Sequence, residues 1–179
     1  QVDVVILGGG AAGLFCAGEC VRRGRRVLVI DGRAAGEKIR ISGGGRCNFT
    51  NLGIAPERFL GRNPRFALSA LRRFTQGDFI ARVDAAGIAW HEKTLGQLFC
   101  DGSATQIVAM LLAAMRGATL WLDTSFSAVA ATSDGFAVET RAGQRSALAD
   151  GNQSAIRPVA VPRQLRWTPA AIAAGSYRV

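Results

Sequence analysis

The stretch Val4-Val5-Ile6-Leu7-Gly8-Gly9-Gly10-Ala11-Ala12-Gly13 decides the fold of this chain. Its four apolar residues are typical of a buried strand and lead directly into a glycine-rich turn. Helix-compatible sequence follows over residues 11–23, where Gly24 ends it, and a second apolar run, Val27–Ile30, then ends on Asp31. This order of strand, glycine turn, helix, strand and acid is the one that a dinucleotide-binding fingerprint requires.

Each glycine of the turn has a physical role in binding a dinucleotide. Gly8 allows the tight turn, Gly10 lets the backbone approach a pyrophosphate, and Gly13 lets the helix lie close to the sheet. The helix N-terminus offers N–H groups and a partial positive charge to the phosphates. Asp31, 18 positions after Gly13, is placed to accept hydrogen bonds from a ribose diol. The competing interpretation, a turn that needs glycine only for packing, leaves this acid unexplained.

A second polar loop, residues 42–51, contains three consecutive glycines beside Arg46. Such a run is not typical of a regular helix or strand, and it offers exposed N–H groups, a guanidinium and short polar side chains. This chemistry suits a second cradle for a phosphate, a ribose or a polar ring edge. Composition alone favours the alternative, a flexible loop without a ligand.

The chain predicts further helices and strands as far as Thr140. Helices are expected over residues 64–74, from Thr75 to a stop at Gly87, and from a capping box at residues 103–106 to Gly117. Short strands are expected at residues 88–91, 96–100 and 118–122, and a hairpin at residues 125–140 with its turn at 133–135. Residues 141–179 contain three prolines with scattered arginines, and they predict neither a strand nor an amphipathic helix.

Composition indicates a globular chain with a basic end. Of the 179 residues 49% are hydrophobic and 20% charged, and the six arginines and one acid of the last 39 residues supply +5 of the net charge of +9. A basic surface can attract nucleic acid, but no recognisable module interleaves aromatic and basic residues, so nucleic acid is not expected as a partner. No apolar run reaches the ~18–20 residues of a membrane helix. With the first strand beginning at residue 2 and no signal peptide before it, we expect a soluble, cytoplasmic protein.

The four cysteines and the single histidine predict no metal site. Cys16 and Cys20 lie one helical turn apart and are predicted to be small buried hydrophobes, with no disulfide framework. Cys47 follows Arg46, where a nearby cation could lower the pKa of its thiol, although a packing role is favoured. His91 is predicted to be a hydrogen-bonded residue at a strand end rather than an acid–base catalyst.

Three segments resemble a bacterial family of FAD-dependent flavoproteins, the NAD(P)/FAD-dependent oxidoreductases that include aminoacetone-oxidase-like enzymes. They are residues 6–14, residues 38–51 (KIRISGGGRCNFTN, far more specific than GxGxxG), and residues 96–100 with Ser103-Ala104. In the third segment Gln97 and Cys100 stand where the family usually has Arg and Pro. The resemblance covers about residues 2–140; full-length members continue with a returning turn, a substrate domain and a further FAD-contacting segment, which are not recognised here.

The resemblance implies an α/β fold: a partial Rossmann-like FAD-binding domain over residues 1–140 that starts with the GxGxxG βαβ unit, has a helical insertion and a β-hairpin, and is incomplete at its C-terminus. It also implies that residues 141–179 are a tail outside this fold, for which we hypothesise a frameshifted or disordered end. Asp31, one methylene shorter than the family's usual Glu, would bind the adenosine ribose, residues 42–51 would pass along the flavin, and the backbone at Ala128 and Val129 would contact the adenine. The expected cofactor-binding residues are Gly8, Gly9, Gly10, Ala11, Ala12, Gly13, Asp31, Gly32, Arg33, Lys38, Ser42, Gly43, Gly44, Gly45, Arg46, Cys47, Asn48, Ala128 and Val129.

The leading functional hypothesis is an FAD-dependent oxidoreductase that transfers hydride from NAD(P)H through FAD to an acceptor, present here as a truncated chain. Its catalytic residues, acceptor and oligomeric state are not assigned by the sequence, and no metal is expected. One alternative is a non-catalytic fragment that binds an adenine dinucleotide or nothing. Another is a basic protein associated with nucleic acid, which only the net charge suggests.

Overall fold

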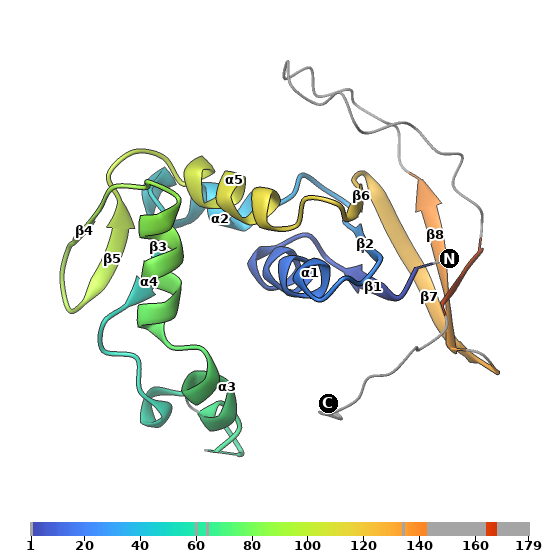
Figure 1. Cartoon of the computed structure of the whole chain (residues 1–179), viewed down its shortest axis with the longest axis horizontal. Coiled ribbons are helices and arrows are strands. Elements are labelled where there is room, and N and C mark those ends of the chain that lie inside the picture. Colours follow the sequence, from blue (N-terminus) through green and yellow to red (C-terminus); the bar gives the residue numbers. More distant parts are fainter. Residues whose placement is uncertain (1, 60, 64, 134, 143–163, 168–179) are drawn as a thin grey trace. The chain divides into compact units, whose positions relative to one another are not determined.

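The computed structural model describes residues 2–59, 61–63, 65–133, 135–142 and 164–167 (Figure 1). The chain divides into two compact units. The first unit is Gln1–Glu37 with Leu111–Val179, and the second unit is Lys38–Met110. No helix in the described ranges is long and apolar enough to cross a membrane.

A parallel sheet with β2 at its centre forms the core of the first unit. Strands β1 (Val4–Leu7), β2 (Val27–Ile30) and β6 (Thr119–Trp121) follow the order β1-β2-β6, and both pairs are parallel. All four residues of β2 are buried, as expected for a central strand flanked by two others. Helix α1 (Ala11–Arg22) connects β1 to β2, so the predicted βαβ unit is confirmed, with the helix ending one residue earlier than expected.

Helix α1 packs through its smallest side chains. Leu14 and Ala17 are fully buried, and a Cβ on Gly18 would lie only 3.3 Å from the Cβ of Ala114, the last residue of helix α5 (Thr105–Ala114).

Before α5, the predicted capping box is half formed: the Gln106 side chain accepts from Ser103 N at 3.2 Å, whereas the Ser103 hydroxyl accepts from Thr105 N.

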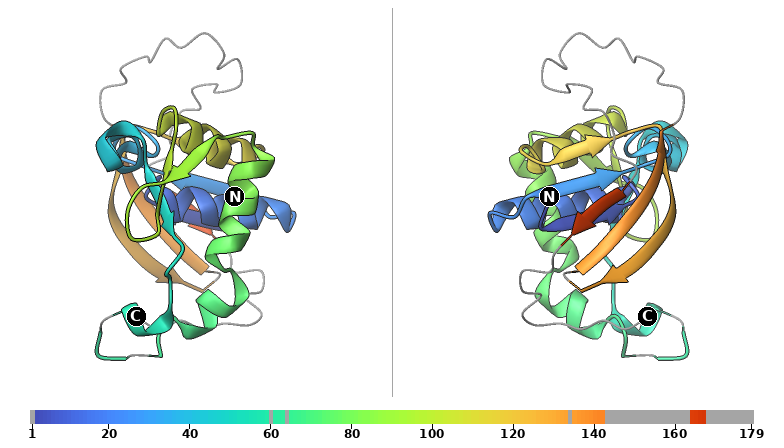
Figure 2. Two further views of the ribbon diagram at one scale, coloured as in Figure 1. Left: turned by 90° about the vertical axis from the view of Figure 1, so that its left-hand side faces the viewer. Right: turned by 90° about the vertical axis from the view of Figure 1, so that its right-hand side faces the viewer.

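An antiparallel sheet completes the first unit. Strands β7 (Thr124–Thr132), β8 (Gly135–Ala142) and β9 (Gln164–Trp167) lie side by side in that order, as Figure 2 shows. The predicted hairpin is therefore confirmed. The prediction of no strand after Thr140 is wrong at β9, because four residues are too few to show a period and their pairing with β8 depends on backbone hydrogen bonds. The remaining residues of the proposed tail, 143–163 and 168–179, lie outside the described residues.

The second unit has its own antiparallel sheet and a set of short helices. Strands β3 (Asn48–Asn51), β5 (Gln97–Cys100) and β4 (Trp90–Glu92) follow the order β3-β5-β4, with the buried Leu98, Phe99 and Cys100 on the central strand. The helical segments are α2 (Glu37–Ile41), η1 (Ser42–Gly45), η2 (Pro56–Arg58), α3 (Leu68–Arg73) and α4 (Gln76–Ala85). The capping box that begins α4 joins Thr75 and Asp78 in both directions, which confirms the predicted start of this helix.

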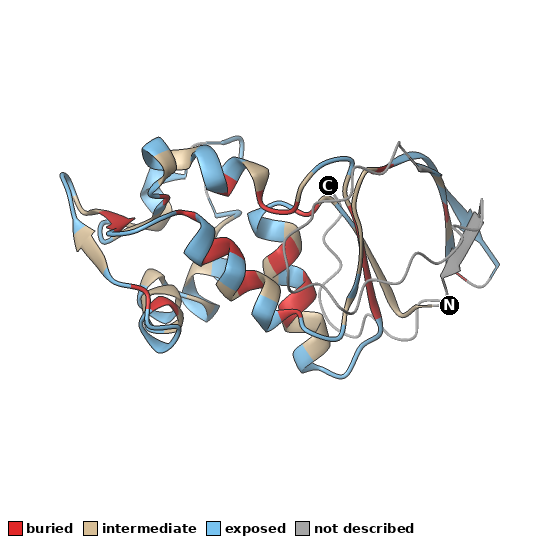
Figure 3. Ribbon diagram, turned by 90° about the horizontal axis from the view of Figure 1, so that it is seen from above, coloured by how far each residue is buried: buried red, intermediate tan, exposed pale blue. Residues whose placement is uncertain are grey.

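The amphipathic helix predicted over residues 64–74 is wrong in extent and in burial. Among the described residues of this range only Leu68–Arg73 are helical, and α3 has no buried residue (Figure 3). Phe66 lies before the helix and is 71% exposed. The apolar spacing of this segment is helical, but no core surface of the second unit covers it.

Candidate dinucleotide-binding site

The glycine turn between β1 and α1 has the geometry of a phosphate loop. Gly8 has φ +107°, a conformation that favours glycine, and its N–H donates to Ile30 O at 2.8 Å. A Cβ on Gly13 would lie 1.9 Å from Gly8 O, so only glycine allows the helix this close to the strand. A Cβ on Gly10 would meet nothing within 4 Å, which leaves open space in front of the turn for a ligand.

The N-terminus of α1 offers N–H groups to an anion. The first helical hydrogen bond runs from Leu14 N to Gly10 O at 2.9 Å, so the N–H groups of Ala11, Ala12 and Gly13 precede it. No side chain caps this end and its first turn has no acidic residue. These groups, together with the helix dipole and the open space at Gly10, fit a pyrophosphate.

Asp31 lies directly beside the glycine turn. Its carboxylate accepts from Gly9 N through one oxygen and from Arg33 N, at 2.8 Å, through the other. The opposite side of Gly9 is also held, because its carbonyl accepts from Gly36 N at 2.8 Å. Each carboxylate oxygen can accept a further hydrogen bond, so the acid can bind ribose hydroxyls while it orders the loop.

The backbone of Asp31 is fixed by β6 and β7, a contact that the sequence did not reveal. Asp31 N donates to Trp121 O at 2.8 Å, and Thr124 N donates to Asp31 O at 3.0 Å. Thr124 is only 4% exposed and its hydroxyl donates to Leu122 O. A threonine at the start of a strand carries no recognisable signal, so its role in positioning Asp31 becomes visible only in the structure.

The other expected ligands of the first unit are arranged along its surface. Gly32 and Arg33 are exposed, and the Arg33 guanidinium pairs with Glu37 at 3.3 Å. Ala128 and Val129 are exposed on β7, where they pair with Glu139 and Val138 of β8. Nothing in these contacts tests their predicted role at the adenine.

The second expected cradle lies in the second unit and is a left-handed turn. Gly43, Gly44 and Gly45 have φ of +59°, +67° and +83°. These positive values lie outside regular helix and strand and favour glycine. A Cβ on Gly43 would lie 2.7 Å from the Phe99 ring and 2.9 Å from Asn48 N, whereas one on Gly44 would meet nothing within 4 Å. The turn is therefore tightly packed on one side and open on the other.

The residues around this turn are held by the second unit's sheet. The Ser42 hydroxyl donates to Ile39 O at 2.9 Å, and Arg46 O accepts from Cys100 N at 2.9 Å. With its amide nitrogen directed at Leu98 O and Thr50 O, the Asn48 side chain forms two hydrogen bonds. The side chains of Lys38 and Arg46 are exposed.

The structure corrects the hypothesis that a cation lowers the pKa of Cys47. Cys47 is buried, and burial raises the pKa of its thiol, an effect that a hydrogen bond with Ser42 partly offsets. Burial likewise raises the pKa of the neighbouring Cys100 to about 11. Both thiols are therefore protonated at neutral pH, which suits packing rather than nucleophilic chemistry.

Two further sequence predictions concern α1 and β4. Cys16 is exposed and Cys20 half-buried, so the prediction that both are buried is wrong; the apolar face of α1 runs through Leu14 and Ala17 instead. His91 pairs with Asp101 through Nδ1 at 2.6 Å and stacks on Phe99, in agreement with a hydrogen-bonded strand residue.

The described part of the chain contains no group of three His, Cys, Asp or Glu side chains that could hold a metal ion.

Comparison with known proteins places this site in a family. Residues 2–157 match the HI0933-like protein Rossmann domain. The chain belongs to this family of FAD-binding Rossmann proteins. The match extends beyond Thr140, where the sequence-based resemblance ended.

The curated relatives of this HI0933-like chain are longer proteins. A protein named ribosomal RNA dihydrouridine synthase from Escherichia coli (strain K12) is 61% identical over 113 residues, which is 63% of this chain and 28% of that protein. One of the same name from Haemophilus influenzae is 56% identical over 108 residues, 60% of this chain and 27% of that protein. A 3-dehydro-bile acid delta(4,6)-reductase from Clostridium scindens is 31% identical over 86 residues, 46% and 21% of the two chains. The matched part thus spans between 21% and 28% of each relative's length.

A solved structure agrees on the fold. The Sdh1 complex of Mycobacterium smegmatis in its apo form matches with a TM-score of 0.58 and 17% sequence identity, over 79% of this chain and 31% of that chain. The predicted fold class, a Rossmann-like α/β domain, is confirmed.

Proposed function

We propose that this chain forms the FAD-binding part of a reductase that converts a uridine of ribosomal RNA to dihydrouridine. The observation that carries the proposal is the glycine turn with Asp31 beside it, in a chain whose matched part is 61% identical to a protein named for that reaction. The Clostridium scindens relative is named as a reductase, which supports the same reaction class. The proposal departs from the sequence-based expectation that nucleic acid is not a partner.

The proposed reaction adds two hydrogens across the C5–C6 double bond of uracil. It consumes one hydride and one proton: we propose that NAD(P)H supplies the hydride and is oxidised to NAD(P)⁺, and that the proton comes from solvent. A bound flavin would supply the hydride chemistry between the two substrates, and the protein would supply binding, orientation and electrostatics.

The residues of the first unit have distinct roles in this proposal. The N–H groups of residues 11–13 bind the pyrophosphate, and Gly10 leaves room for it. Asp31 accepts hydrogen bonds from the adenosine ribose while it holds Gly9 in place. Trp121 and Thr124 position Asp31 through its backbone.

Flavin binding by the purified chain tests the cofactor. We expect the chain to retain FAD through desalting, as judged by its visible absorbance. Asp31→Ala removes the hydrogen bonds that the charged carboxylate would accept from FAD. Such bonds contribute about 1.5–3 kcal/mol, so we expect FAD affinity to fall about 10- to 150-fold. Asp3→Ala, which removes a partly buried carboxylate that pairs with Arg26 away from the glycine turn, is the matched control and keeps the wild-type affinity. A chain that circular dichroism shows to be folded but that retains no FAD would support the alternative of a non-catalytic fragment.

Dihydrouridine in ribosomal RNA tests the substrate. In the source organism, disruption of the gene should remove a dihydrouridine from ribosomal RNA, measured by mass spectrometry of nuclease digests. Re-expression of the intact gene should restore it. Unchanged dihydrouridine after disruption would reject the substrate while leaving the FAD site untouched.

A further inference from the structure

The second unit carries an excursion, residues 53–75, between strand β3 and helix α4. Its two ends meet, because the Gln76 side chain amide donates to Leu52 O at 3.2 Å. None of the excursion's described residues is buried, and neither η2 nor α3 contributes to the core. The excursion is therefore a surface segment held at its base.

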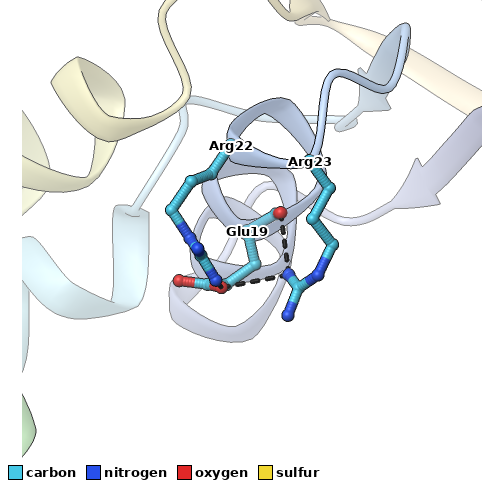
Figure 4. Close-up of polar contacts among 3 residues, drawn as sticks. All are labelled: Glu19, Arg22 and Arg23. Carbon is cyan, nitrogen blue, oxygen red and sulfur yellow. Dashed lines mark hydrogen bonds and ion pairs between the residues drawn. The ribbon is translucent and has the colours of Figure 1, made fainter.

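The charge of the excursion is strongly positive. It contains a single acid, Glu57, and five arginines, all of them exposed: Arg58, Arg62, Arg65, Arg72 and Arg73. Within the described ranges these five arginines make no ion pair, whereas Arg22 and Arg23 both pair with Glu19, at 2.8 and 3.0 Å (Figure 4). The excursion thus presents cations that no acid of the described chain neutralises.

Two exposed phenylalanines are interspersed with these arginines. Phe59 follows Arg58 and is 46% exposed, and Phe66 follows Arg65 and is 71% exposed. Exposed aromatic faces beside guanidinium groups are the combination that binds single-stranded nucleic acid, since the ring stacks on a base and the cation contacts the phosphate.

We propose that the excursion, residues 53–75, is an RNA-binding surface whose arginines contact phosphates and whose Phe59 and Phe66 stack on unpaired bases. This inference rests on the proposed function and adds the residues that would recognise the RNA. A lipid surface fits less well, because α3 has only six residues and is too short for an amphipathic membrane helix. The five cations are all arginine, whose planar fork matches a phosphate, and none is lysine.

Binding of a short RNA hairpin with a uridine-containing loop tests this surface. The Kd is measured by fluorescence anisotropy at several salt concentrations for the chain and two variants with equal loss of charge. The test variant is R58Q/R62Q/R65Q/R72Q/R73Q, and the control variant, altered at exposed arginines outside the excursion, is R22Q/R23Q/R25Q/R116Q/R141Q. We expect the test variant to lose about 0.7 of the log–log salt slope for each phosphate contact, up to about 3.5, and the control to keep most of it.

Phe66 separates stacking from charge. Phe66→Ala should weaken binding between about fivefold and a hundredfold with no change in salt slope, and Phe66→Trp should bind at least as well as wild type. Because the excursion buries no described side chain, the variants within it should have the wild-type urea midpoint, which excludes misfolding as the cause.

Three results would overturn the inference. The first is equal loss of affinity in the test and control variants, which would mean non-specific charge. The second is a wild-type Kd for the RNA in both Phe66→Ala and the test variant. The third concerns phosphatidylglycerol vesicles. If they displace the RNA from the wild-type chain and do not bind the test variant, the surface would be assigned to lipid. FAD retention and loss of dihydrouridine on gene disruption do not depend on these results, so the proposed function would stand if this surface failed.

Discussion

The glycine turn and the excursion present different groups to their proposed ligands. The turn offers backbone N–H groups. Gly8 N donates to β2 and Gly9 N to the Asp31 carboxylate, and the Asp31 backbone donates to β6 and accepts from Thr124 at the start of β7. The excursion offers side chains, and a hydrogen bond between Leu52 and Gln76 joins its ends. A site made of backbone needs a rigid fold to aim its groups, whereas a surface made of arginine and phenylalanine needs mainly exposure and charge. Substitutions should therefore destabilise the first region and spare the second.

Gly13→Ala should have the largest effect. The new Cβ would lie 1.9 Å from Gly8 O, so helix or strand must shift, and we expect the free energy of unfolding to fall by at least about 3 kcal/mol, with loss of FAD. Urea unfolding measures the change. Gly10→Ala is the control: it meets open space and should stay within about 0.5 kcal/mol of wild type while still binding FAD more weakly. Wild-type stability of Gly13→Ala would contradict the close approach of α1.

Removing apolar atoms should distinguish the two regions next. Val29 is 0% exposed on β2, and Val29→Ala should lower the free energy of unfolding by about 2 kcal/mol. Phe66→Ala removes a larger side chain, yet it should cost less than about 0.5 kcal/mol because that ring is already exposed. Equal costs in urea unfolding would show that the excursion is packed after all.

Thr75→Ala should loosen the base of the excursion. It removes the N-cap of α4, and such a cap typically contributes about 1 kcal/mol. Limited trypsin digestion should then cut faster at Arg72 and Arg73, and the cleavage sites are read by mass spectrometry. Ser69→Ala, an exposed change on α3 that removes no cap, should leave the digestion rate unchanged; acceleration by both variants would argue against the cap.

Alkaline pH tests the two buried thiols, Cys47 and Cys100. The folded state raises the pKa of Cys47 and Cys100, so between the ordinary thiol pKa and about 11 the unfolded chain loses protons that the folded chain keeps. Stability from these groups is therefore intact below about pH 8.5 and declines as pH rises toward 11. Urea midpoints across this range should fall less in a Cys47→Ala/Cys100→Ala variant than in wild type. An identical decline would assign it to other groups.

Much of the first unit could be predicted because its signals are local. The apolar runs at β1 and β2, the glycines between them and the acid after them each depend on neighbours in sequence. The same holds for the start of α4, whose capping box is formed by residues three apart. In each case backbone geometry and side-chain chemistry agree within a few residues.

The features that could not be predicted depend on contacts between distant segments. Thr124 meets Asp31 only because β6 pairs with β2, and β9 is a strand only because β8 offers it an edge. The apolar spacing around Phe66 predicted a packed helix, but Phe66 is exposed. A helical period shows which residues share a face, not whether another element covers that face. For Cys47 the sequence favoured packing but left open a thiol whose pKa a cation lowers; burial, which raises that pKa, agrees with packing.

The sequence by itself determined the βαβ core, the place of the glycine turn and the acid beside it, because glycine, helix caps and apolar runs act over short distances. The tertiary structure decided which groups hold Asp31 in place and which arginines and phenylalanines stay exposed. Burial and long-range backbone pairing set these properties, and both depend on how the whole chain folds.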